Sequence, residues 1–473
     1  MAKVLIYDIS RQARAPASIA LADAQNCFDS IAHAIASIIF QALGVPIGAI
    51  ESMLETVENM KYFLRTAYGD SKRYAGSRIR VKFQGMCQGS GAAAAGFCVV
   101  SVVILQAHQR KGHAATFVCP ISKHEAKLSS IIFVDDTDLI HINLAGDEDV
   151  DDVHVAMQSS INSWGELLIA SGGRLNPDKC FAYLMSYVWN SQGKWKYSSN
   201  EDNEEYGFAV PLPDGTSVPI RHLGVDQPEE TLGVFSCPSG DQSSLIKKMQ
   251  DKADEWIGRA KDSHLGRRDI WFLVERQLWM GLKYGLCCHS SEWRVMEGIL
   301  HKQWHQLVPM GGVICSAPAS LRQLDAGFFG IGCPHVGVEC FVEQINKMLI
   351  HYGCSSSVGF GFKVSVEYMI LELGVAFQPF QVSYKKYSKR LTKCWLKSLW
   401  EKCQMFGVQI LLNLKEDGIQ MPRAGDKWIM LEFERIGCCG DVLERLNRVR
   451  LYMQVLFLSD VLGANGKILI GST

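Results

Sequence analysis

The chain has 16 cysteines among 473 residues but no Cys-x-x-Cys pair, which argues against a zinc knuckle. Its adjacent cysteines, at 287–288 and 438–439, suit neither a usual disulfide nor a zinc site. No secretory signal precedes the first charged residues. We therefore expect free thiols in a reducing intracellular compartment, either the nucleus or the cytoplasm.

The chain also has almost no net charge. The sequence has 48 Lys and Arg against 49 Asp and Glu, a formal net charge of −1, so any basic surface for nucleic acid must be local. Internal repeats and low-complexity tracts are also absent. With 48% hydrophobic and 21% charged residues the composition is that of a globular protein, and the length predicts two to four domains.

Long hydrophobic runs are scarce. One stretch, residues 91–107, is uncharged over 17 residues, which is the short limit for a membrane span. The sequence offers no second candidate. We interpret this stretch as a buried helix inside a domain and expect no membrane partner.

What the chain does have is an acidic hairpin at residues 131–140. Apolar residues before it and alternating apolar and polar residues after it predict two strands. The link between them holds Asp135, Asp136 and Asp138. Acids between buried strands are costly unless something neutralises them, and a divalent cation is the usual solution. An ordinary polar turn fits this stretch equally well.

Other elements follow from local patterns. We predict strands at 3–7 and 18–22, helices at 29–43 and 46–68, a basic hairpin arm at 72–82, and hairpins turning at 190–193 and 214–215. The basic arm, with Tyr74 among its charges, suits a nucleic-acid backbone, although a solvated hairpin face is the preferred interpretation. The acidic run 146–152 lacks the glycine and glutamate of a calcium loop, so we interpret it as the first turn of a helix that ends near residue 170. After residue 241 the chain is mainly helical.

Three features then converge. Asp23 ends a predicted strand, residues 85–91 form a glycine-rich loop, and Asp135-Asp136 occupy the hairpin link. The order of strands and helices allows a sheet to bring Asp23 beside Asp135. Two or three carboxylates at one sheet edge are what a pair of magnesium ions needs for in-line phosphoryl transfer.

These segments resemble the sequence motifs of reverse transcriptases. Asp23-Ala-Gln-Asn-Cys-Phe-Asp29 resembles motif A, Gly85-Met-Cys-Gln-Gly89 motif B, and Phe133-Val-Asp-Asp136 motif C. Further on, residues 175–180 resemble motif D and residues 231–240 motif E with the start of the thumb. The run at 325–334 is similar to one beyond the thumb in non-LTR (LINE-like) retroelement polymerases. No single motif is specific, but five in the correct order are.

The resemblance implies an α+β fold. It would be a polymerase palm, an antiparallel sheet with helices on one face, followed by a mainly helical thumb and C-terminal region. The implied division is a palm with a remnant of the fingers at 1–230, a thumb at 231–310, and a helical region of unknown role at 311–473.

The resemblance also implies catalytic roles. Asp23 and Asp135 would be the main ligands of two Mg²⁺ ions, or of Mn²⁺ in their place, and Asp136 a weaker ligand. Lys179 would approach the triphosphate and donate a proton to the pyrophosphate leaving group; a solvated loop lysine is the alternative.

Substrate-binding residues are implied in the same way. Phe28 would be the steric gate beneath the sugar, or else a core aromatic beside the site. Gln88 and Gly89 would line the incoming nucleotide and the template base. Leu232 and Gly233 would form the primer grip.

The chain departs from the family at its front, where only 22 residues precede Asp23 and the family has a fingers domain. We therefore expect a palm and thumb without most of the fingers. The implied function is that of an RNA-directed DNA polymerase from a retroelement, a nucleotidyltransferase with an RNA template, a DNA primer and deoxynucleoside triphosphates as partners. The alternative is a non-catalytic nucleic-acid-binding or assembly protein that retains a palm as scaffold.

Overall fold

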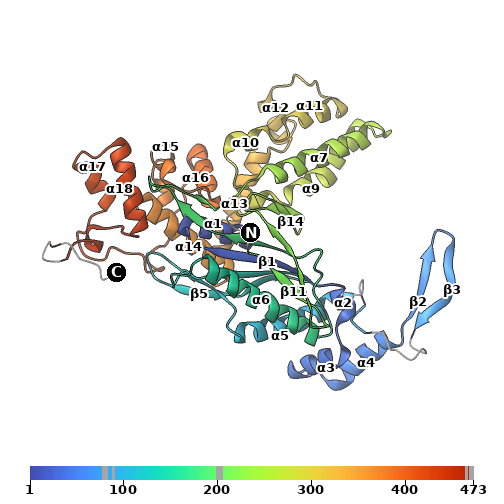
Figure 1. The fold of residues 1–473 in the computed structure, drawn as a ribbon. Coiled ribbons are helices and arrows are strands. Elements are labelled where there is room, and N and C mark those ends of the chain that lie inside the picture. The colour runs from blue at the N-terminus through green and yellow to red at the C-terminus, as the bar shows by residue number, and fades with distance from the viewer. Residues whose placement is uncertain (77–83, 88–90, 199–205, 464–466, 468–473) are drawn as a thin grey trace.

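The computed structural model describes residues 1–76, 84–87, 91–198, 206–463 and 467 (Figure 1). Its fold is α+β. A five-stranded sheet lies at the centre, and its strands run in the order β13 (Arg221–Leu223), β8 (Phe181–Met185), β1 (Ala17–Asp23), β7 (Asp136–Ile142) and β6 (Ser130–Phe133). All neighbours are antiparallel except β13 and β8, which are parallel, so the sheet is mixed.

Helices cover both faces of this sheet, whereas the sequence predicted helices on one. Every residue of β1 is buried, as expected for a central strand between two layers. Ile19 and Leu21 belong to a core shared with α1 (Ala2–Ala13) and α14 (Ser357–Leu373). The alternate residues Ala20 and Ala22 belong to a second core, shared with α5 (Gly91–Arg110) and α6 (Val150–Ala170).

The predicted strand at 3–7 was wrong, because these residues lie inside α1. Leu5, Ile6, Tyr7 and Ile9 are all buried, and a short apolar run of this kind does not distinguish a buried helix from a buried strand. Both sides of α1 are occupied because it packs between the sheet and the C-terminal helices.

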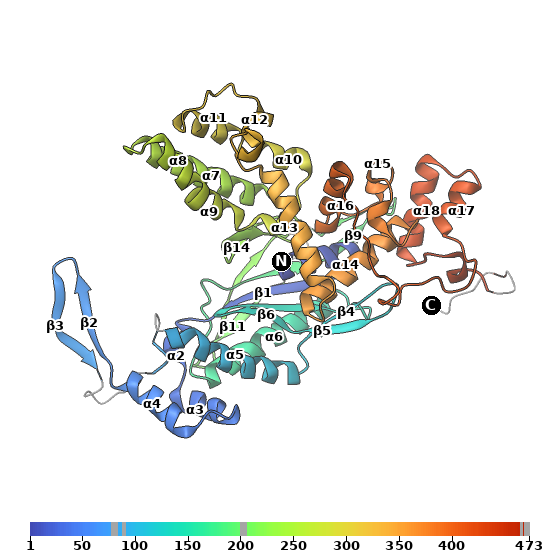
Figure 2. The same ribbon diagram turned by 180° about the vertical axis from the view of Figure 1, so that it is seen from behind.

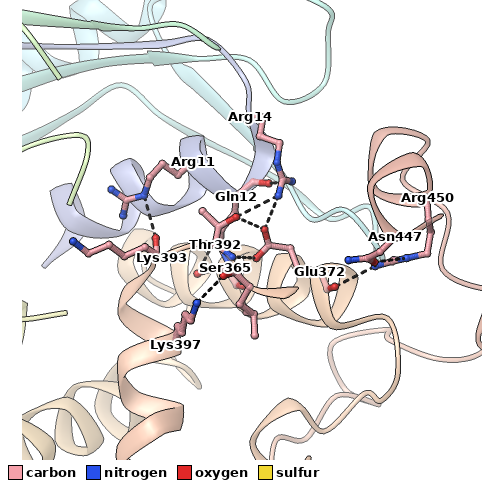
Figure 3. Close-up of polar contacts among 11 residues, drawn as sticks. Arg11, Gln12, Arg14, Ser365, Glu372, Thr392, Lys393, Lys397, Asn447 and Arg450 are labelled. Atoms are coloured by element: carbon pink, nitrogen blue, oxygen red, sulfur yellow. Dashed lines mark hydrogen bonds and ion pairs between the residues drawn. The ribbon is translucent and has the colours of Figure 1, made fainter. Parts of the chain in front are cut away.

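Polar contacts fix α1 to the C-terminal region (Figure 3). Arg14 pairs with Glu372 at 2.8 Å, and the hydroxyl of Ser365 donates to Gln12 at 2.8 Å. Arg11 donates to the carbonyl of Lys393 at 3.1 Å. Helix α1 and the C-terminal region therefore form one packed body.

A projecting arm follows β1. The short helices α2 (Cys27–Ser30), α3 (His33–Ala42) and α4 (Ile47–Glu58) lead to a hairpin of β2 (Lys61–Thr66) and β3 (Gly69–Gly76) that extends away from the body (Figures 1 and 2). The predicted helix at 46–68 therefore ends too late, because the segment after Asn59 holds Tyr, Phe and Thr, which favour strands. Part of the predicted arm at 72–82 lies in β3, and residues 77–82 lie outside the described residues.

Several two-stranded hairpins lie outside the five-stranded sheet. The hairpin turns predicted at 190–193 and 214–215 are confirmed. Asp149 caps α6 in a capping box with Asp152, as the acidic run predicted. The hairpin strands are β4 (Ala115–Val118) with β5 (Glu125–Leu128), β9 (Tyr187–Trp189) with β10 (Trp195–Tyr197), β11 (Ala209–Pro211) with β12 (Ser217–Pro219), and β14 (Glu229–Thr231) with β15 (Val234–Ser236).

Helix α5 is the one helix in the described ranges that is long and apolar enough to cross a membrane by length and composition. Its Phe97, Val100 and Ile104 are buried in the core shared with α6, which is the arrangement predicted for a helix inside a domain.

The remainder of the chain is helical. A third core, apart from the sheet, joins the helices after β15 to the start of α13. The helices that contribute to this core are α7 (Ser243–Lys261), α8 (Arg267–Leu273), η2 (Val274–Trp279), α9 (Met280–Lys283), η3 (Leu286–Cys288), α10 (Trp293–Gly298), α11 (His301–Met310) and α13 (Val336–His351). Between α11 and α13 lie α12 (Ala319–Gln323) and η4 (Ala326–Phe328), which are not part of it. After α14 follow η5 (Pro379–Gln381), α15 (Tyr384–Tyr387), η6 (Ser388–Arg390), α16 (Trp395–Phe406), α17 (Ile429–Arg435), α18 (Gly440–Tyr452) and η7 (Leu458–Asp460).

Candidate active site

The pairing of β1 with β7 brings the predicted acids together. Asp23, the last residue of β1, lies directly opposite Asp136, the first residue of β7. Residues directly opposite in an antiparallel pair present their side chains on the same face. Phe133 of β6 also pairs with Asp136, so Val134 and Asp135 form a two-residue link. The three predicted metal ligands thus meet at one end of the sheet.

The link carries backbone strain. Val134 has a φ of 58°, in the left-handed region that β-branched residues avoid. Such strain costs roughly 1–3 kcal/mol and persists where the surrounding structure imposes it. Here β6 and β7 impose it on the residue next to Asp135.

Negative charge accumulates at this end of the sheet. Burial raises the pKa of the Asp23 carboxyl, and the charge of Asp135 raises it further, while Lys179 lowers it. Burial likewise raises the pKa of Asp136, with Asp135 and Asp23 as the next causes. Both shifts have the direction expected of carboxylates that repel one another in partial burial.

Lys179 reaches this group from the loop that precedes β8. The backbone N–H of Asn176 donates to the carbonyl of Asp23 at 2.9 Å, which fixes the loop against the end of β1. Lys179 Nζ lies 3.8 Å from Asp23 Oδ2, and its side chain is 67% exposed. It is therefore a solvated lysine that lies beside the acids, and its predicted role toward the triphosphate stays a prediction.

Phe28 lies in α2, next to the segment that resembles motif B. The N–H of Met86 donates to the carbonyl of Phe28 at 2.6 Å, and the N–H of Gly85 to that of Ile31 at 2.9 Å. A Cβ on Gly85 would lie 2.3 Å from the Cα of Asp29, so glycine is required for this close approach. The Phe28 ring is half-buried and meets Phe97 edge-to-face at 5.7 Å. Its packing matches the core-aromatic interpretation, and the steric-gate role stays a prediction.

Gln88 and Gly89, the predicted nucleotide-binding residues, lie outside the described residues. The structure therefore does not place them relative to Asp23 or Phe28. The described part of this segment ends at Cys87, which has a φ of 61°.

Leu232 and Gly233, the predicted primer grip, form the turn between β14 and β15. Their φ values of 51° and 81° are both positive, as in type I′ hairpin turns. Leu232 and Thr231 line a groove of about 600 Å³ together with Ile131 and Asp138 of the acidic hairpin. The predicted grip and the acidic hairpin thus share one groove.

Lys3 connects these two hairpins and was missed by the sequence reasoning. Its Nζ lies 2.7 Å from Asp138 Oδ1 and donates to Thr231 Oγ1 at 3.2 Å. The only sequence signal was a lysine beside a buried apolar run. Asp138 could have been placed from strand alternation, since it lies two residues after Asp136 and therefore on the same face.

The donor chemistry of the three aspartates fits magnesium. Carboxylate oxygens are the ligands that Mg²⁺ prefers. The pKa values of Asp23 and Asp136 are raised first by burial and then by the neighbouring acids, and a bound cation would offset both causes. Among the residues that the structure describes, however, no three His, Cys, Asp or Glu side chains are grouped closely enough to hold a metal ion. The backbone aligns Asp23 with Asp136, while the side chain of Asp23 points toward Lys179.

Comparisons with known proteins assign no family. No protein-family model and no curated protein matches the chain. Among the solved structures, a telomerase from Candida albicans in complex with a fragment of telomeric RNA aligns over 82% of this chain and 51% of its own, with 11% identity and a TM-score of 0.29. The chain thus spans about half the length of that neighbour. A likeness this weak establishes no shared fold.

Proposed function

We propose that the chain is the palm and thumb of a reverse transcriptase of non-LTR retroelement type, an RNA-directed DNA polymerase. The observation that carries the proposal is the register that places Asp23 opposite Asp136, with Asp135 in the adjoining link. Acids from two separate segments of the chain meet at one sheet end, as two-metal phosphoryl transfer needs. Its partners are an RNA template, a DNA primer and deoxynucleoside triphosphates.

Each residue near the acids has a part in this proposal. Asp23 and Asp135 are the main ligands for two Mg²⁺ ions, and Asp136 a weaker one. Bound Mg²⁺ supplies Lewis-acid chemistry, which lowers the pKa of the primer 3′-hydroxyl and neutralises triphosphate charge. Lys179 is exposed and adjacent, so it can bind the triphosphate and hold a proton for the pyrophosphate leaving group.

Two further segments orient the substrates. The carbonyl of Phe28 accepts a hydrogen bond from the N–H of Met86, and the half-buried Phe28 ring, which meets Phe97, would lie beneath the sugar. The β14–β15 turn at Leu232-Gly233 holds the primer, and Lys3 fixes this hairpin to β7. Positioning of both substrates is the main contribution a protein makes to phosphoryl transfer.

Primer extension on an RNA template with Mg²⁺ tests the proposal. The chain should add deoxynucleotides, and Asp135→Ala should reduce the rate at least about 100-fold, the usual scale for loss of a group that acts on transition-state charge. The matched control is Asp147→Ala, which removes an exposed acid from the loop before α6 and should extend normally. If the wild-type chain binds template and primer but adds no nucleotide, and the Asp135→Ala variant behaves in the same way, the non-catalytic alternative is correct.

A further inference from the structure

A groove of about 970 Å³ lies between the β9–β10 hairpin and α18. One wall holds Trp189 and Lys194 of the hairpin, and the other holds Arg445, Arg448 and Tyr452 of the helix. The groove contains no residue of the motifs described above, and α18 belongs to the C-terminal region whose role the sequence left open (Figure 2).

Large aromatic side chains are exposed on both walls. Trp189 is 46% exposed and Tyr452 is 80% exposed, and neither ring contacts another ring in the described part of the chain. Because both rings lie in one groove and leave much of their surface uncovered, each can contact a ligand bound there. A flat ring on each wall suits a ligand that is itself flat.

The charge of the groove is net positive. Lys194, Arg445 and Arg448 face Asp441 and Glu444, and Glu444 is paired with Arg448 at 3.3 Å. Lys194 and Arg445 form no ion pair among the described residues. Two cations that lack partners, set beside aromatic rings, are complementary to a ligand that alternates flat rings with negative charges.

Both walls are held in place from behind. Tyr187 and Tyr197 fix the hairpin to the body through hydrogen bonds to Ser10 at 2.7 Å and to the carbonyl of Pro238 at 2.9 Å. On the other side, Arg450 of α18 donates to the carbonyl of Glu372 at 3.1 Å (Figure 3). Walls fixed in advance lose little freedom when a ligand binds.

We propose that this groove binds a single-stranded nucleic-acid segment. Bases stack on Trp189 and Tyr452, while Lys194 and Arg445 contact the phosphates, the combination by which proteins hold single strands without reading sequence. The inference goes beyond the proposed polymerase activity and needs none of Asp23, Asp135 or Asp136.

Fluorescence anisotropy with a labelled single strand of about 12 nucleotides tests the proposal, a length within the usual site sizes. Trp189→Ala and Tyr452→Ala should each weaken binding about 10-fold, and Trp189→Phe and Tyr452→Phe, which keep a ring, should recover most of it. Arg445→Ala should reduce the slope of log affinity against log salt concentration by about 1. The experiment is done with an RNA strand and with a DNA strand of the same sequence. Weaker binding of either strand by the alanine variants supports the proposed binding groove.

The matched control is Phe329→Ala, which removes a ring that is 95% exposed outside the groove and should leave affinity unchanged. The proposal is overturned if the Trp189→Ala, Tyr452→Ala double variant binds both strands with wild-type affinity, if the phenylalanine variants bind as weakly as the alanine variants, or if Phe329→Ala weakens binding equally. Failure of the polymerase proposal is a separate result, since Asp135→Ala should reduce extension at least about 100-fold and leave strand binding intact.

Discussion

At the scale of single residues, the end of the sheet concentrates acids beyond what nearby lysines neutralise. Asp23 has Lys179 at 3.8 Å and Asp138 has Lys3 at 2.7 Å, whereas Asp136 has no ion pair in the described residues. Repulsion between neighbouring acids lowers the free energy of unfolding, and such a cluster of acids is retained where function needs it. This is the residue-level reason to regard the acids as a site and not as an ordinary turn.

The repulsion predicts that Asp136→Asn stabilises the protein at neutral pH. Burial and the neighbouring acids raise the pKa of Asp136 in the folded state. A carboxyl with a raised folded pKa costs stability above that pKa, and the cost vanishes below its unfolded pKa of about 3.9. After allowance for solvent screening, the variant should gain roughly 0.5 kcal/mol at pH 7 and lose the gain as pH falls toward about 4.

Urea unfolding of wild type and variant at several pH values measures this gain. Asp147→Asn is the control, because it removes an exposed acid away from the cluster and should change little. A variant that is less stable than wild type at pH 7 would show that Asp136 has a favourable partner and that the acids are not in conflict.

At the scale of elements, close backbone contacts between segments hold the site together. The segment at 84–87 packs on α2 through the backbone of Gly85, which has a φ of 79°. Gly85→Ala would place a methyl group against Phe28 and Asp29, at 2.3–2.5 Å from their backbone atoms. We expect a loss of at least about 3 kcal/mol in the free energy of unfolding.

Gly112→Ala is the matched control for this substitution. Gly112 has a φ of 91°, but no atom lies within 4 Å of the point that an alanine methyl group would occupy, so the variant tests backbone conformation without the clash. It should cost about 1–2 kcal/mol. Equal losses in the two variants would mean that Gly85 is needed for its conformation alone.

Lys3 is the second contact between elements, since it joins α1 to Asp138 of β7. A double-mutant cycle tests this contact. Lys3→Met leaves Asp138 buried without its partner and should cost about 3 kcal/mol, whereas Lys3→Met with Asp138→Leu should recover much of the loss. Urea denaturation provides all the values of the cycle. Additive losses would show that the two side chains do not interact.

Local chemistry decided which elements could be predicted from the sequence. The turns at 190–193 and 214–215 follow from their own residues. Strand order predicted that Asp23 lies beside Asp135, whereas the observed register pairs Asp23 with Asp136 and leaves Asp135 in the adjoining link. Lys3 could not be placed, because its partner lies 135 residues away. The prediction of a strand at residues 3–7 failed for a related reason, since the burial of this segment depends on α14, which comes late in the chain.

At the scale of the whole molecule, the C-terminal region completes the core of the sheet. Leu5 of α1 packs with α14, and Glu372 of α14 accepts hydrogen bonds from Arg14 at 2.8 Å and from the hydroxyl of Thr392 at 2.5 Å. The predicted division at residues 230 and 310 stays a prediction. The shared core nevertheless implies that the central sheet and the C-terminal helices unfold together.

Glu372→Ala tests this shared core. It leaves the half-buried Arg14 without its carboxylate partner, so we expect a loss of about 3–5 kcal/mol, with tryptophan fluorescence and far-UV circular dichroism shifting together. Glu416→Ala, which removes an exposed acid of the same region, should have little effect. Two separate transitions in the variant would show that the C-terminal region is an independent unit.

The most direct test of the proposed active site is single-nucleotide incorporation on a preformed RNA template–DNA primer complex with Mg²⁺. The chain should incorporate the complementary deoxynucleotide. Asp23→Asn and Asp135→Asn should each lose at least about 100-fold in rate at unchanged template–primer affinity, while Asp147→Asn incorporates normally. Wild-type rates in the Asp23→Asn and Asp135→Asn variants would contradict the assignment of these acids as the metal-binding centre.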